Sequence, residues 1–93
     1  MDDTDLIGQI VVSKRGRDCG LTFVVLNSCE EEFLFITDGR LRKVEKPKKK
    51  KMKHLTYTGY RSEVLRSMLL KEQYVTNRQV REELKKFDAM KSQ

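Results

Sequence analysis

The chain has 93 residues, of which 38% are hydrophobic and 37% charged, and its formal net charge at pH 7 is +6. This length leaves room for one domain, which argues against a deep catalytic cleft between two lobes. The apolar fraction is sufficient for a folded core. The positive charge predicts a polyanionic partner, either nucleic acid or an anionic lipid surface.

Compartment and metal content follow from the apolar runs and the cysteines. No apolar run approaches the roughly 20 residues that cross a bilayer, and the first residues are acidic where a signal peptide is basic. We therefore expect a cytoplasmic protein. Cys19 and Cys29 flank the apolar run 21–26, and an extended strand would separate them by roughly 30 Å, so both are predicted to be free thiols. With His54 as the only histidine and no Cys-x-x-Cys pair, we expect neither a metal site nor a cofactor.

Three short β-branched and aromatic segments predict strands at 7–13, 21–27 and 33–37. Between the first two lies the segment 14–20, which has two glycines and a basic tip and predicts a hairpin loop. The third strand is followed by Asp38-Gly39, a strong hairpin signal that predicts a returning strand over 40–44.

The single proline, Pro47, lies in the lysine run 46–51, where repulsion between like charges favours an extended loop. The alternation in 52–58 predicts the last strand, which Gly59 ends. Short strands in series with turns between them predict a small barrel or sandwich.

Beyond Gly59 the apolar spacing becomes helical, which predicts helices over 61–73 and 77–90. Thr76 and Gln79 form a capping-box pattern before the second helix. Arg78 with Glu82, and Glu82 with Lys86, are opposite charges at helical spacing.

The first hairpin carries a family resemblance. Gly16-Arg17-Asp18-Cys19-Gly20, set between two apolar strands, resembles the KOW motif of RNA-binding domains in ribosomal proteins and transcription factors. The resemblance extends through Asp38-Gly39 and the segment 42–49 and covers residues 7 to about 55. Over this range the chain is similar to the eukaryotic-type "fourteen-e" large-subunit ribosomal proteins and their small bacterial relatives. Phe23 stands where many KOW motifs have a glycine, and the fourteen-e branch resembles this chain in lacking that glycine. Cys19 replaces a basic residue of the turn.

This resemblance implies an SH3-like (KOW) β-barrel of about five strands. With the two C-terminal helices that the apolar spacing predicts, the expected fold class is mainly β with an α extension. Residues 1–5 would be a flexible N-terminus, 6–58 the barrel and 59–93 the helical extension. The implied function is non-enzymatic RNA binding in or on the ribosome. The implied partner is rRNA of the large subunit, with the chain a monomer outside the ribonucleoprotein.

The charge pattern points to the same class of partner without the family. Cations crowd the segment 40–54, where the only acid is Glu45, so their fields add. A second basic edge lies on the hairpin 14–17. The predicted RNA-binding residues are Lys14, Arg15, Arg17, Arg40, Arg42, Lys43, Lys46, Lys48, Lys49, Lys50, Lys51, Lys53 and His54. Whether the hairpin lies near the lysine run is left open by the sequence.

Structural alternatives stand beside these assignments. The lysine run could be only a solvated face or a targeting signal. Asp18 is expected to pair with Arg17 or to cap its turn, and is not a site residue. His54 and Tyr57 could stack on bases or be ordinary strand residues. The aromatic residues expected in the core are Phe33, Phe35 and Phe87.

Other functions are also weighed. No set of Ser, His and Asp, paired carboxylates or phosphate-binding glycine loop can be assembled, so we expect no enzyme. A lysine loop without an aromatic amphipathic helix anchors weakly to a membrane, so no membrane partner is expected. The main alternative is a protein–protein adaptor that uses the edge of the barrel.

Overall fold

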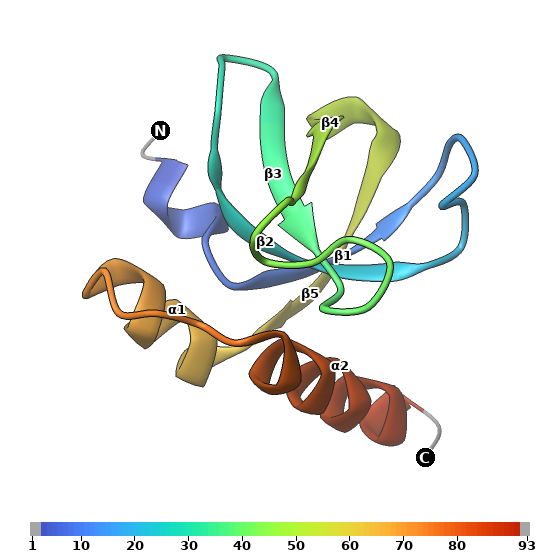
Figure 1. The fold of residues 1–93 in the computed structure, drawn as a ribbon. Helices are drawn as coiled ribbons and strands as arrows, with labels where there is room; N and C mark the ends of the chain where they lie inside the picture. Colours follow the sequence, from blue (N-terminus) through green and yellow to red (C-terminus); the bar gives the residue numbers. More distant parts are fainter. Residues whose placement is uncertain (1–2, 92–93) are drawn as a thin grey trace.

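The computed structural model describes residues 3–91, which form one antiparallel sheet with two helices packed against one side (Figure 1). Short 3-10 helices are labelled η. In chain order the elements are η1 (Asp3–Leu6), β1 (Gln9–Ser13), β2 (Thr22–Ser28), β3 (Phe33–Thr37), β4 (Lys48–Lys51), η2 (Met52–His54), β5 (Leu55–Arg61), α1 (Glu63–Leu70) and α2 (Asn77–Lys91). Part of the expected N-terminal tail is thus the helix η1, while residues 1 and 2 lie outside the described residues.

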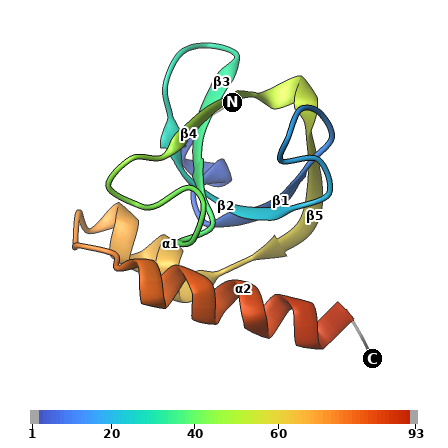
Figure 2. The ribbon, with the colours of Figure 1, turned by 45° about the vertical axis from the view of Figure 1, so that its right-hand side comes forward.

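The five strands lie in the order β4-β3-β2-β1-β5. The expected number of strands is confirmed, but the two edge strands β4 and β5 are not paired with each other, so the sheet does not close into a barrel. The sheet is strongly curved, and the three residues of η2 carry the chain from one edge to the other (Figure 2).

The prediction of a strand over 40–44 is wrong. This segment is irregular because the Asp38 side chain takes up its backbone donors: Asp38 Oδ1 accepts from the amides of Arg40 at 3.0 Å and Arg42 at 2.8 Å. The Thr37 hydroxyl also bonds to the Arg42 carbonyl. Local side-chain bonds of this kind compete with a strand ladder.

The fourth strand is instead the lysine run, β4, which had been predicted to be a loop. It pairs with β3 from Phe33↔Lys51 to Ile36↔Lys48. Pro47 precedes the strand and so removes no ladder bond from it. Lysine suits an edge strand, because its long stem can cover apolar surface while the ammonium group stays in water.

The last strand is shifted relative to its prediction over 52–58. The first three of those residues form η2, and β5 continues through Gly59 to Arg61. Opposite β1 the pairing shifts between Gln9 and Val11, and Gly59 has φ +82° at this irregularity. Glycine adopts that conformation at little cost, which lets the strand bulge without ending.

The core has two parts, one on each face of the sheet. Val11, Phe23 and Leu34 belong to a cluster that the curved sheet encloses, whereas Ile10 and Val24 belong to a cluster covered by the helices. This double burial explains why β2 is apolar at successive positions. The helix side contributes Leu65, Val75, Val80 and Leu84.

The prediction of the aromatic core is wrong for Phe33 and Phe35 and correct in part for Phe87, which packs against the helix-side cluster. Phe33, Phe35 and Phe87 are only partly buried, and Phe23 is the buried phenylalanine. In β3 the inward positions belong to Leu34 and Ile36. An apolar run on both faces gives no alternation from which the sequence could show this.

Both predicted helices form, but α1 is shorter than its prediction over 61–73, since Arg61 belongs to β5 and the helix ends at Leu70. Ser62 caps α1, its Oγ accepting from the Leu65 amide at 3.2 Å. The capping box of α2 is confirmed: the Thr76 amide donates to Gln79 Oε1 at 2.8 Å, and the Gln79 amide donates to Thr76 Oγ1 at 3.1 Å. Within residues 3–91, no helix has the length and apolar character needed to cross a membrane.

Candidate nucleic-acid interface

The first basic segment is the hairpin between β1 and β2. Its neck is closed by backbone bonds from the Ser13 amide to Leu21 and from the Gly20 amide to Ser13. Gly16 and Gly20 have φ +80° and +88°, which this tight turn requires. The turn therefore exposes Lys14, Arg15 and Arg17.

The second basic segment is β4, whose lysines divide between the two faces of the sheet. Residues paired directly across an antiparallel ladder share a face. Lys48 and Lys50 therefore lie on the side of Ile36 and Leu34, and Lys49 and Lys51 on the side of Phe35 and Phe33. On that second side, the ammonium groups of Lys49 and Lys51 lie 4.7 and 5.7 Å from the centre of the Phe33 ring.

The two basic segments meet. Lys50 Nζ donates to the carbonyl oxygen of Arg15 at 2.8 Å, and the Lys14 amide donates to the carbonyl of His54, also at 2.8 Å. The first bond comes from a side chain on β4 and the second anchors the hairpin to η2. The curvature of the sheet thus makes one basic surface out of segments that the sequence separates.

His54 lies where these segments meet, since its backbone carbonyl accepts from the Lys14 amide. Its imidazole is half-buried, and burial, followed by the fields of Lys53, Arg15, Lys50 and Lys51, lowers its pKa below the usual 6.5. Four cations from three parts of the chain are thus close enough to disfavour a further positive charge. We call Arg15, Lys50, Lys51, Lys53 and His54 the basic cluster.

Acidic residues border the cluster on one side. Glu30 pairs with Lys49 at 2.8 Å, so Lys49 is partly neutralised, although an exposed pair of this kind contributes only about 0–1 kcal/mol. Glu31 and Glu32 lie with Lys51 and Lys53 around a small pocket of about 170 Å³. A polyanion would therefore meet less repulsion on the hairpin side, where Arg15 and Lys50 lie.

Arg42 does not belong to this surface. Its guanidinium donates to Asp18 Oδ2 from Nε at 3.3 Å and from Nη2 at 3.2 Å. The Asp18 side chain is 7% exposed. The structural role predicted for Asp18 is confirmed, but its partner is Arg42 and not Arg17. Arg42 serves to compensate a buried carboxylate.

The remaining predicted residues are dispersed. Lys43 and Lys46 are exposed on the irregular segment after β3, where the Lys46 amide closes a turn to Lys43. Arg40 lies apart from the cluster, in a groove beside α2. Tyr57 is 40% exposed on β5, and burial raises its pKa.

The sequence missed the outward placement of Phe33 as well as the cations of α2 that share the groove with Arg40. A helical spacing of Arg78, Arg81 and Lys85 was visible in the sequence, but which face of α2 would remain uncovered was not.

Both cysteines are free, as predicted, and both are exposed. Among the described residues, no three His, Cys, Asp or Glu side chains lie together in a way that could hold a metal ion. No protein-family model and no curated protein matches the chain. The resemblance to KOW domains therefore remains a prediction from the motif.

Proposed function

We propose that this protein is a non-enzymatic RNA-binding protein, ribosomal or ribosome-associated, that contacts RNA phosphates through the basic cluster and the hairpin 14–17. The observation that carries the proposal is that the two basic segments meet, with Lys50 Nζ 2.8 Å from the backbone carbonyl oxygen of Arg15. The ribosomal part depends on the sequence resemblance alone.

The proposal includes an SH3-like fold for the sheet. It is supported by the five antiparallel strands in the order β4-β3-β2-β1-β5 and by the strong curvature of their sheet (Figure 2). The glycine-flanked turn 16–20 joins the first two strands, β1 and β2, as the resemblance to the KOW motif implies. In this arrangement the basic cluster lies where the turn meets the connection between β4 and β5.

Clustered cations suit a phosphate chain because their potentials add and because phosphate contact releases condensed cations. Each neutralised phosphate contributes about −0.7 to −0.9 to the slope of log affinity against log salt. With four such contacts, raising the salt concentration from 50 to 200 mM would weaken binding by about 50- to 150-fold. Since phosphates carry no base information, sequence specificity would be modest.

The test is fluorescence anisotropy with fragments of large-subunit rRNA at a series of salt concentrations. We expect a linear loss of log affinity with log salt, and migration of the endogenous protein with large ribosomal subunits on a sucrose gradient. Binding that ignores salt would contradict phosphate contact. Binding to RNA without migration with subunits would remove only the ribosomal part.

A variant pair separates the cluster from general positive charge. Lys53→Glu reverses one charge in the cluster, whereas Lys71→Glu reverses one exposed charge at the end of α1. Both variants have the same net charge. Equal loss of affinity in the two would show that binding depends on overall charge and would overturn the assigned site.

A further inference from the structure

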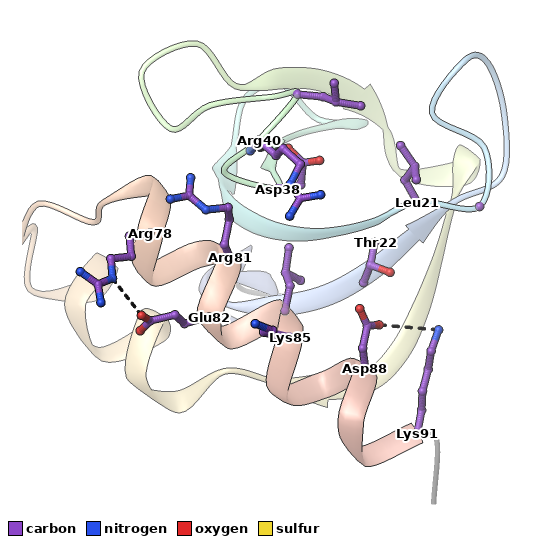
Figure 3. A pocket seen from close by; sticks show the side chains of 13 residues that line it. Leu21, Thr22, Asp38, Arg40, Arg78, Arg81, Glu82, Lys85, Asp88 and Lys91 are labelled. Atoms are coloured by element: carbon purple, nitrogen blue, oxygen red, sulfur yellow. Dashed lines mark hydrogen bonds and ion pairs between the residues drawn. The ribbon is translucent and has the colours of Figure 1, made fainter.

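A second surface lies between α2 and the turn that follows β3. It is an open groove of about 780 Å³, also bordered by the start of β2 (Figure 3). The groove is lined by α2, whereas the basic cluster surrounds η2. The ribbon shows α2 and the connection between β4 and β5 on opposite sides of the molecule (Figures 1 and 2). The two surfaces can therefore be altered independently.

One wall of the groove is set by α2. Arg78, Arg81 and Lys85 follow one another at helical spacing along the side of α2 that lines it. Arg81 Nη1 donates to the carbonyl of Gly39 at 2.7 Å. This bond holds the turn after β3, which forms the opposite wall, against α2, so the width of the groove is fixed at this point.

The groove also exposes apolar side chains. Leu41 is 67% exposed and Leu21 is 38% exposed, whereas Leu84, on α2 itself, is almost buried. Two exposed leucines facing a groove leave apolar surface in water that a partner could cover.

The charges of the groove argue against RNA as its occupant. Three carboxylates line it together with five cations: Asp38, Glu82 and Asp88 against Arg40, Arg78, Arg81, Lys85 and Lys91. A phosphate chain, negative at every unit, would be repelled by the carboxylates, and no aromatic ring lines the groove to stack a base. A protein segment can alternate charge with apolar side chains and so fit both features.

Two cations of the groove have no carboxylate partner among the described residues and, unlike Arg81, no backbone carbonyl partner, so they remain available for a ligand. Arg78 pairs with Glu82 at 3.0 Å and Lys91 with Asp88 at 3.8 Å. Arg40 and Lys85 form no ion pair within residues 3–91. They project from opposite walls of the groove (Figure 3).

We propose that this groove binds a protein segment in which a leucine-type side chain is flanked by carboxylates. The apolar side chain lies between Leu21 and Leu41 over Leu84, and the carboxylates meet Arg40 and Lys85. The protein would then link RNA at one side to a protein partner at the other. This second interface stands whether or not the basic cluster binds RNA.

The experiment uses three probes with the full chain. The first is a fluorescein-labelled peptide of sequence Gly-Ser-Glu-Leu-Glu-Ser-Gly, the second is the same peptide with serine in place of the leucine, and the third is oligouridine. We expect the leucine peptide to bind about tenfold more tightly than the serine peptide and to shift the amide resonances of Leu21, Leu41 and Lys85.

Three variants locate the binding. Arg40→Glu/Lys85→Glu should weaken the leucine peptide about tenfold, and Leu41→Ser, at an exposed position that the fold does not need, should do so without altering the charge. Lys53→Glu, an exposed residue of the basic cluster, should leave peptide binding unchanged. The proposal is overturned if the two peptides bind alike, if neither shifts the groove amides, or if oligouridine occupies the groove in their place.

Discussion

Lys50 Nζ donates a hydrogen bond to the backbone carbonyl of Arg15, 35 residues earlier in the chain, at 2.8 Å. A carbonyl oxygen attracts the ammonium group without cancelling its charge. Lys50 can therefore hold the hairpin against β4 while its positive charge continues to act on the surroundings. A structural contact and the proposed RNA contact coincide in one side chain.

Lys50→Met should weaken RNA binding because it keeps most of the apolar stem but removes both the charge and the donor. We expect the salt dependence of log affinity to become shallower by about 0.7–0.9, the contribution of one phosphate contact. The measurement is RNA anisotropy at four or more salt concentrations. Lys71→Met, an exposed lysine on another face, serves as the control and should keep the original slope. An unchanged slope in Lys50→Met would remove Lys50 from the interface.

Arg42→Met should lower stability far more than it lowers RNA affinity. It leaves the Asp18 carboxylate, which is 7% exposed, without its ion-pair partner. We expect the free energy of unfolding to fall by about 1–3 kcal/mol, as measured by urea denaturation. Asp18→Asn in the same chain should restore part of that loss, since it removes the uncompensated charge. A large loss of RNA affinity in the folded variant would instead return Arg42 to the binding surface.

Gly39→Ala should destabilise the fold more than Gly20→Ala does. Both glycines have positive φ, +72° and +88°, so both substitutions introduce backbone strain of about 1–2 kcal/mol. At Gly39 the added Cβ would also lie 2.5 Å from the carbonyl oxygen of Asn77, whereas at Gly20 it meets nothing within 4 Å. We expect a total cost of about 3 kcal/mol or more at Gly39. Equal urea midpoints for the two variants would contradict the close approach of this turn to α2.

The elements that the sequence predicted are those whose signals are local. Strands β1 to β3 follow from short β-branched runs between turns, and α2 begins where Thr76 and Gln79 form their reciprocal cap. Strand β4 has no such signal, because four lysines carry neither alternation nor strand propensity. It is a strand because β3 offers a free edge, which is a property of the assembled sheet.

The candidate site was predicted in its composition but not in its geometry. Arg15, Lys50 and His54 were each singled out as cations or rings in basic segments. Their convergence depends on the curvature of the sheet and on the three-residue turn η2, and neither is visible in a linear pattern. For the same reason the partner of Asp18 was missed, since Arg42 lies 24 residues away and reaches it only across the folded hairpin.

His54 should couple RNA binding to pH. In the folded protein its pKa is lowered, first by burial and then by Lys53, Arg15, Lys50 and Lys51. The unfolded chain therefore takes up a proton at higher pH than the folded one. The contribution of His54 to the free energy of unfolding is fully present above its ordinary pKa of about 6.5 and declines as the pH falls below that value. This decline ends once the folded protein is also protonated.

RNA should counteract the lowering of the His54 pKa, because phosphate beside the basic cluster offsets the cations that disfavour the imidazolium. We expect RNA to raise the pKa of His54 and RNA affinity to increase as the pH falls from about 7 to about 5.5. The Hε1 resonance of this single histidine, titrated with and without RNA, measures the shift directly. His54→Gln should bind RNA with a flatter pH dependence. If the pKa of His54 does not change on adding RNA, the phosphates do not approach the basic cluster, because a negative charge close to that imidazole must favour its protonated form.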